Sequence, residues 1–225
     1  DLGFEVEETF VTGVRLVATG NECIRLNLQL RCASQVLYSL EQFHAANADA
    51  VYTKLLSYPW EALIPENGYF SVTSNVQNDS INNNLFANLR VKDAIADRLR
   101  NKRGVRPATG SELAGAVIHL FWKENDAEIF VDTSGDSLAR HGYRKIPGLA
   151  PMLESLAAAT IYASRWDRVS PFINPMCGSG TIAIEAAQVA CNMAPGGFDQ
   201  FYVPRHIGLY AGVPLEVPAL MVQRI

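Results

Sequence analysis

Cysteine and histidine are scarce in this chain, which has four of each among 225 residues. The cysteines show no C-x-x-C pair, and the histidines show no spacing that is typical of a metal site. A disulfide scaffold and a zinc module are therefore disfavoured. We expect reduced thiols, a cytoplasmic location and no bound metal.

Long apolar runs and an excess of positive charge are also missing. No run of about 18 apolar residues is present and no signal peptide opens the chain, so the sequence predicts no contact with a membrane. The formal net charge of −4 disfavours nucleic-acid binding through the whole surface. Any such contact must therefore come from a local basic patch.

An initiator methionine is absent as well, because the sequence starts at Asp1, and we therefore expect a processed or partial chain. What remains is an ordinary globular composition, with 48% hydrophobic and 19% charged residues. A chain of this length can form one large domain or two small ones.

The N-terminal part has the pattern of a small α+β unit. Alternating apolar and polar residues predict strands at 4–7, 13–18 and 22–28. Apolar residues at helical spacing then predict a helix from 30 to 40. This part shows no pattern that carries chemistry.

The middle part is predicted to mix helices and strands. Helical spacing predicts helices at 48–60 and 82–99, and alternation predicts a strand at 68–74. A hairpin is expected at 116–132, where two alternating runs flank a short polar turn.

Positive charge is concentrated between Arg90 and Arg106. Seven basic residues lie there against the two acidic residues Asp93 and Asp97. On charge alone, a solvated helix face and a phosphate-binding surface are equally good interpretations.

The most informative stretch is an apolar run at 172–173, a loop rich in Pro and Gly, and an Ala-rich helix that starts near Thr181. This order predicts a strand, a tight loop and a helix. Gly178 and Gly180 let the backbone adopt positive φ and approach a ligand closely. The helix start offers unpaired N–H groups, at which a phosphate or a carboxylate can bind.

Three interpretations of this loop compete. A P-loop would need Lys followed by Ser or Thr after the last glycine, whereas Thr181 and Ile182 follow here. A dinucleotide fingerprint needs three glycines, and only Gly178 and Gly180 are present. A tight turn without any ligand is the third interpretation.

The loop sequence N-P-M-C-G-S-G-T at 174–181, followed by I-E-A-A at 184–187 and A-P-G at 194–196, resembles the first motif of S-adenosylmethionine-dependent RNA methyltransferases that carry a THUMP domain. Asn174 replaces the leading Asp of that motif. The resemblance implies that the loop wraps the methionine and ribose end of the cofactor. The implied cofactor contacts are Pro151, Asn174, Pro175, Met176, Cys177, Gly178, Ser179, Gly180 and Thr181.

The segment from Asp132 to Arg144 resembles the signature D-x-S-G-D-x-L-x-x-R-G-Y-R, which closes the THUMP region in this family, with His141 in place of the first Arg. The resemblance implies an α+β part followed by an α/β part. These are a ferredoxin-like region at 1–55, a THUMP domain at 56–147 and, at 148–225, an incomplete start of a Rossmann-like class I methyltransferase domain. The implied RNA contacts are Lys92, Arg98, Lys102, Arg103, Arg140 and Arg144, and the last two could instead bridge the domains.

The implied activity is methyl transfer to the N2 atom of a guanine in large-subunit ribosomal RNA. The chain has no N-P-P-Y or D-P-P-F run, the catalytic motif of the family, so no catalytic residue is assigned and this chain alone is expected to be inactive. Asp199 and Glu216 are weak candidates for the acid that binds ribose. Cys177 fits a packing role beside the ligand better than a covalent one. The alternative function is a non-catalytic THUMP module that binds RNA and carries a truncated or vestigial cofactor fold.

Overall fold

The computed structural model describes residues 2–78, 81, 83–146, 150–195 and 219–224. The predicted domain boundary at 147–148 and the two weak ribose candidates, Asp199 and Glu216, lie outside the described residues. The strands are β1 (Val6–Thr9), β2 (Gly13–Val17), β3 (Ala33–His44), β4 (Tyr69–Gln77), β5 (Ala108–Gly110), β6 (Ala116–Lys123), β7 (Asp126–Asp132) and β8 (Ala219–Arg224). The helices are α1 (Gly20–Gln29), α2 (Ala48–Ser57), α3 (Trp60–Leu63), α4 (Asn84–Arg103), α5 (Glu154–Ala163) and α6 (Thr181–Ala190).

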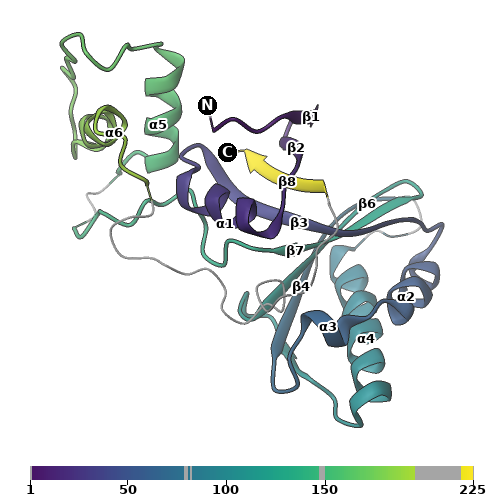
Figure 1. Cartoon of the computed structure of the whole chain (residues 1–225). Coiled ribbons are helices and arrows are strands. Elements are labelled where there is room, and N and C mark those ends of the chain that lie inside the picture. Colours follow the sequence, from purple (N-terminus) through teal and green to yellow (C-terminus); the bar gives the residue numbers. More distant parts are fainter. Residues whose placement is uncertain (1, 79–80, 82, 147–149, 196–218, 225) are drawn as a thin grey trace.

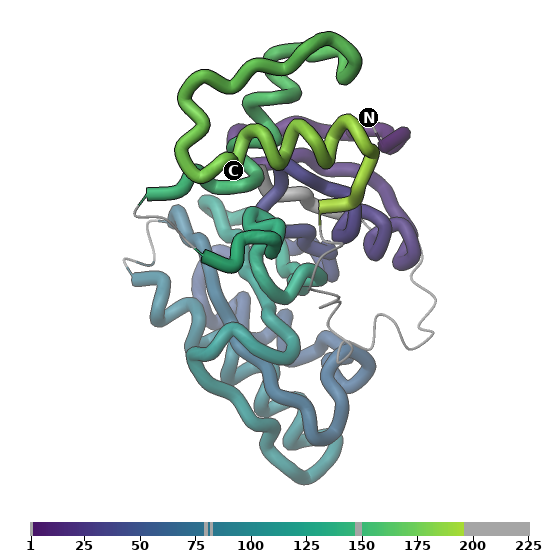
Figure 2. The backbone as a smooth tube through the Cα atoms, turned by 90° about the vertical axis from the view of Figure 1, so that its left-hand side faces the viewer, coloured from purple at the N-terminus to yellow at the C-terminus, as the bar shows by residue number. Residues whose placement is uncertain are grey.

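The strands form one mixed sheet in the order β1-β2-β8-β3-β7-β6-β4-β5. Strand β4 runs parallel to both β5 and β6, whereas the other neighbouring strands are antiparallel. Figure 1 shows α2, α3 and α4 together beside one end of this sheet, and α5 and α6 in a lobe at the other end. The same two ends are separated vertically in Figure 2.

The core of the middle part lies between α4 and the sheet. Strand β6 turns Ile118, Leu120 and Trp122 toward this core, and all three are buried. The indole of Trp122 donates a hydrogen bond of 3.0 Å to the backbone carbonyl of Ala45, so its polar atom is satisfied despite burial. The hairpin predicted at 116–132 is confirmed as β6 and β7, and the helix predicted at 82–99 is confirmed as part of α4. Helix α4 is capped by Gly104, whose φ of 75° lies in the left-handed region.

Two predictions in the N-terminal part are wrong, because residues 22–28 lie in helix α1 and residues 33–40 lie in strand β3. Helix α1 starts with a capping box, in which the Thr19 hydroxyl accepts from the Glu22 backbone N–H and the Glu22 carboxylate accepts from the Thr19 N–H. Strand β3 is buried on both faces, so its consecutive apolar residues do not alternate and look like one side of a helix.

Helices α5 and α6 pack against each other in the lobe that follows the sheet (Figure 1). The strand predicted at 172–173 is not formed, so that prediction is wrong. The Phe172 ring instead packs on Trp166, with 5.0 Å between ring centroids, and Ile173 is 82% exposed. A single extended segment needs a neighbouring strand, and none pairs with it among the described residues.

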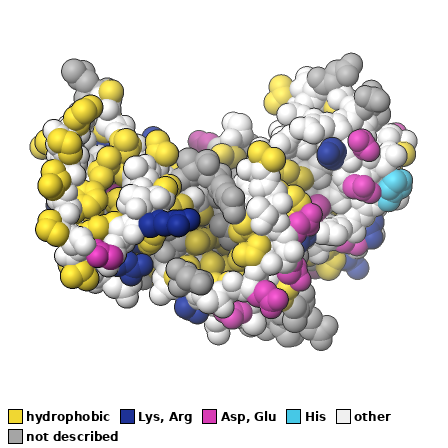
Figure 3. Space-filling model, turned by 90° about the horizontal axis from the view of Figure 1, so that it is seen from above, with side chains coloured by type: hydrophobic (Ala, Val, Ile, Leu, Met, Phe, Trp, Pro, Cys, Tyr) yellow, Lys and Arg dark blue, Asp and Glu magenta, His cyan; other side chains and the backbone are white. Residues whose placement is uncertain are grey.

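The lobe has many exposed large apolar side chains for its length. Figure 3 shows hydrophobic side chains gathered over the side where α5 and α6 lie. The exposed apolar side chains between 152 and 193 are Met152, Leu156, Tyr162, Val169, Ile173, Met176, Ile184 and Met193. A patch of this kind normally packs against another protein element.

Candidate functional site

The loop before α6 has the backbone that its glycines predict. Gly178 and Gly180 have φ values of 52° and 79°, which lie in the left-handed region. A Cβ atom on Gly178 would meet no atom within 4 Å, and one on Gly180 would only reach Ile184 Cδ1 at 4.0 Å. The glycines therefore serve the turn and leave an open surface, rather than filling a tight place in the core.

The start of α6 faces this loop. The helix is capped by the backbone of Gly180 without any side-chain cap, and the Ile184 N–H makes the first helical hydrogen bond back to the Gly180 carbonyl, at 2.9 Å. The N–H groups of the first turn thus remain available to an anion. Residues 175–179 are exposed, and the side-chain nitrogen of Asn174 is buried without a hydrogen-bond partner among the described residues.

Thr181 and Pro151 are placed differently from the rest of the predicted cofactor contacts. Thr181 is buried, and its hydroxyl accepts a hydrogen bond of 2.7 Å from Arg144 and lies 3.2 Å from the hydroxyl of Ser179. Pro151 is partly exposed and precedes α5. The structure therefore brings residues 174–180 together as one exposed loop and turns Thr181 toward the protein.

Arg144, a predicted RNA contact, lies behind the loop. Besides its bond to Thr181, its guanidinium donates to the Met152 carbonyl at 3.1 Å and lies 3.6 Å from a Glu154 carboxylate oxygen. The side chain is only 15% exposed. This geometry fits the bridging role, whereas Arg140 is exposed and in no ion pair among the described residues.

A buried ionic cluster lies one turn further along α6. The Oε1 atom of Glu185 lies 2.7 Å from His141 Nδ1, and its Oε2 atom lies 3.5 Å from the guanidinium of Arg31. Arg31 also donates to the side chain of Gln188 at 3.3 Å. Burial, together with the charge of Glu185, raises the pKa of Tyr143 beside this cluster.

Sequence reasoning missed the role of Arg31, Glu185 and Gln188 and noted His141 only as a departure from the signature. The one available signal is Glu185 itself, because a carboxylate within an Ala-rich apolar helix has to find a cationic partner if that helix face is buried.

The basic helix α4 is less free than its composition suggests. Arg98 binds both carboxylate oxygens of Glu61, at 2.6 and 3.0 Å, and Arg103 donates to the Glu61 backbone carbonyl at 2.7 Å. Three further ion pairs neutralise this region: Arg90–Asp49, Arg100–Asp97 and Arg106–Asp93. Lys92 and Lys102 are in no ion pair among the described residues, so they are the α4 cations best able to meet phosphate.

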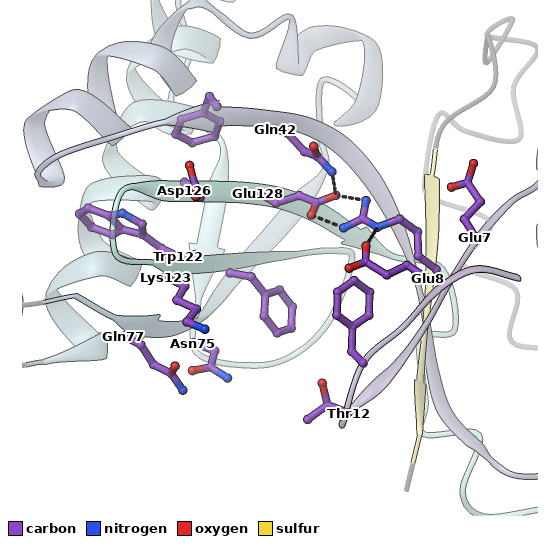
Figure 4. A pocket seen from close by; sticks show the side chains of 15 residues that line it. Glu7, Glu8, Thr12, Gln42, Asn75, Gln77, Trp122, Lys123, Asp126 and Glu128 are labelled. Atoms are coloured by element: carbon purple, nitrogen blue, oxygen red, sulfur yellow. Dashed lines mark hydrogen bonds and ion pairs between the residues drawn. The ribbon is translucent and has the colours of Figure 1, made fainter.

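An open hollow of about 1090 Å³ lies between the β1–β2 hairpin and the β6–β7 hairpin. Figure 4 shows Glu128 at its side, where it pairs with Arg15 at 2.7 and 3.0 Å and accepts from Gln42 at 3.0 Å. The hollow is lined by four carboxylates and two cations. The carboxylates are Glu7, Glu8, Asp126 and Glu128, and the cations are Arg15 and Lys123. Carboxylates outnumber cations, so the hollow is a poor place for a phosphate backbone.

Neither a membrane span nor a metal centre is found in the described part of the chain. No helix in the described ranges is long and apolar enough to cross a membrane. In the same ranges, no three His, Cys, Asp or Glu side chains are grouped as metal ligands would be.

Two domain families match the sequence. The THUMP domain matches residues 45–132, and the RMKL-like methyltransferase domain matches residues 141–217. The chain is 37% identical over 183 residues to the ribosomal RNA large subunit methyltransferase K/L of Magnetococcus marinus, covering 80% of this chain and 25% of that protein. It is 36% identical over 195 residues to the enzyme of the same name from Vibrio cholerae, covering 87% and 28%. The chain thus spans about a quarter of the length of these curated relatives.

The chain is also similar to solved structures whose titles describe methyltransferases of other or unstated substrates. A predicted N6-adenine-specific DNA methylase from Listeria monocytogenes is 32% identical, with a TM-score of 0.78 over 87% of this chain and 51% of that one. A methyltransferase complexed with SAH is 31% identical, with a TM-score of 0.69 over 81% of this chain and 48% of that one. The chain therefore belongs to the methyltransferase family in which a THUMP domain precedes an RMKL-like methyltransferase domain.

Proposed function

We propose that this chain is the RNA-binding and cofactor-loop part of an S-adenosylmethionine-dependent RNA methyltransferase. Its proposed substrate is large-subunit ribosomal RNA, and the proposed methyl acceptor is guanine N2. The names of the curated relatives support the RNA class. The observation that carries the proposal is the exposed loop at Gly178 and Gly180, which lies at the start of α6, where no side chain caps the helix.

The residues of this loop fit S-adenosylmethionine. The methionyl carboxylate suits the N–H groups in the first turn of α6, where the helix dipole favours negative charge. The missing Cβ atom of Gly178 leaves room for a ligand along the backbone. Asn174 is neutral and so lacks the charge of the family's Asp, and its unpaired amide nitrogen is buried and has to turn toward the loop surface before it can donate to the ligand. When bound, this cofactor supplies an electrophilic methyl group.

The chain's own contribution is binding and orientation. Holding the acceptor base in line with the methyl group is the kind of positioning that gives large rate gains in such transfers. The half-buried Lys92 and the exposed Lys102 and Arg140 are proposed to meet RNA phosphates, which fix orientation without reading sequence. The domain limits 1–55, 56–147 and 148–225 remain part of this proposal.

A non-catalytic RNA-binding module is the second candidate function. It is favoured by the THUMP domain match at 45–132 and by Lys92 and Lys102, which are in no ion pair among the described residues, because RNA contact alone needs only this part of the chain.

Isothermal titration separates these two functions. We expect this chain to bind S-adenosylmethionine with a micromolar Kd and to bind an RNA stem-loop with an affinity that falls as salt increases. A Gly178→Val variant should lose the cofactor and keep the RNA, since the added side chain enters open space beside the loop. RNA binding without cofactor binding in the wild type would favour the module. A DNA stem-loop of matched sequence tests the RNA class, because one solved relative is described as a DNA methylase.

A further inference from the structure

Three charged side chains from distant parts of the sequence meet in the interior. Arg31 lies between α1 and β3, His141 follows β7, and Glu185 lies in α6. Their exposed fractions are 8%, 4% and 0%. Buried charges are costly unless they are paired and hydrogen-bonded, and removing one partner leaves the others uncompensated. The cluster is therefore a strong constraint on how α6 sits against the rest of the chain.

Both ring nitrogens of His141 are used in this cluster. Nδ1 lies 2.7 Å from Glu185 Oε1, and Nε2 lies 3.1 Å from the Arg31 backbone carbonyl oxygen. The carbonyl can only accept, so Nε2 donates to it, and a second hydrogen bond joins Nδ1 to the Glu185 carboxyl group. Each oxygen of Glu185 thus faces one basic side chain, and neither of these side chains belongs to α6.

The cluster contacts the same face of α6 as the hydrogen bond from Arg144. Thr181, Glu185 and Gln188 are spaced by four and three residues, so they share one helix face, and all three are buried. Arg144 holds Thr181, and Thr181 contacts Ser179 in the glycine loop. The inner face of the helix is thus fixed at two successive turns, and the loop is left open at its outer end.

We infer that His141 and Glu185 are positioning residues, which fix α6 and the glycine loop against the segment between α1 and β3. Cofactor affinity then depends on an ionic cluster that the cofactor does not touch. This inference rests on the proposed function, since it takes the glycine loop as the cofactor site.

The test uses S-adenosylhomocysteine binding together with the alkylation of Cys177, which is exposed within the loop. The alkylation rate by iodoacetamide is mapped on peptides by mass spectrometry, so that Cys191 is counted separately. We expect His141→Asn to weaken S-adenosylhomocysteine binding by about tenfold, as for a missing hydrogen bond to a charged group, and to speed the alkylation of Cys177 several-fold. Cys23, which is 2% exposed, should stay unreactive and report an intact core.

Two variants make the test specific. His44→Asn carries the same substitution at an exposed histidine and should behave like the wild type. His141→Arg supplies a side chain with several N–H donors, as in the signature that this segment resembles, and should restore both the affinity and the slow alkylation. A merely structural loss of the imidazole volume would not be repaired by the larger, charged side chain.

The outcomes separate the positioning role from the proposed function. If S-adenosylhomocysteine neither binds the wild type nor protects its Cys177, the proposed function fails, whereas faster alkylation in His141→Asn still supports the positioning role. If His141→Asn keeps the wild-type affinity and alkylation rate, the inference is overturned. If His141→Asn does not fold by circular dichroism, Glu185→Gln replaces it with the same expected results and the same contrary result, because it keeps the side-chain volume and changes only the group that faces His141 and Arg31.

Discussion

Arg144 and Thr181 are joined by a 2.7 Å hydrogen bond from the guanidinium to the hydroxyl, at the first residue of α6. The same guanidinium reaches the Met152 carbonyl and Glu154 at the start of α5. One side chain from the segment that follows the sheet thus holds the N-terminal ends of both lobe helices.

From this bond we predict that Arg144→Ala weakens S-adenosylhomocysteine binding several-fold and leaves RNA affinity close to the wild-type value. The reason is that the side chain is used inside the protein and is only 15% exposed. Arg144→Lys should recover only part of the affinity, because an ammonium cannot reproduce the forked geometry. Calorimetric titration with each ligand measures both effects, and a large drop in RNA affinity in Arg144→Ala would place this residue in the RNA interface instead.

Gly180→Ala should destabilise the chain by about 1–2 kcal/mol, since a residue with a Cβ pays this amount in the left-handed region that Gly180 adopts. Urea unfolding measures the change. Gly20→Ala in the first turn of α1 is the matched control, and it should be neutral or slightly stabilising. Equal destabilisation in the two variants would contradict the role assigned to the backbone of the loop.

Charge reversal at Lys92 and Lys102 should weaken RNA binding. It should also reduce the slope of the logarithm of the binding constant against the logarithm of the salt concentration by about one for each lost lysine–phosphate contact. Arg98→Gln should cost more stability than RNA affinity, because it breaks the bidentate pair with Glu61. Binding isotherms at several salt concentrations measure both the RNA affinity and its salt dependence in each variant. An Arg98 variant with the larger salt effect would show that this ion pair opens when RNA binds.

The pair of Glu61 with Arg98 also predicts an acid sensitivity. Hydrogen bonds from Arg98 lower the pKa of Glu61 below its usual value of 4.5, so the unfolded chain binds a proton at a higher pH than the folded chain. The stabilisation is complete above that usual value and disappears as the pH falls through the lowered pKa. Urea midpoints measured between about pH 6 and pH 3 should fall less steeply in Glu61→Gln than in the wild type. Parallel curves would refute this linkage.

The exposed apolar face of the lobe should cause self-association. Ile173 is 82% exposed and packs in no strand, so Ile173→Asp should reduce association and leave the melting temperature within a few degrees of the wild type. Light scattering across a concentration series measures the association. A fall of the melting temperature by about ten degrees or more would mean that Ile173 is packed in solution.

Local patterns predict the middle of the fold well and the N-terminal part poorly. Helix α4 and the β6–β7 hairpin have strong periodicity, and their short-range pairing agrees with it. The pattern of β3 favours a helix because neighbours on both faces bury its side chains, and sequence alone does not show those neighbours. Tertiary context decides this element against its local pattern.

The candidate site divides in the same way. The conformation of Gly178 and Gly180 could be predicted because positive φ is a property of single residues. The partners of Glu185 could not be predicted, because His141 and Arg31 are 44 and 154 positions away in the sequence and meet it only after folding. Only the unusual carboxylate in an apolar helix pointed toward them.

The position of β8 in the sheet limits the order in which the strands can pair during folding. Its residue Val222 pairs with Val14 of β2 on one side and with Val36 of β3 on the other, so strands from early in the sequence are joined through a late one. Closing such a long loop slows folding, whereas the β6–β7 hairpin forms from adjacent residues. Until β8 is added, β2 and β3 each have an unpaired edge, and such edges pair readily with other chains.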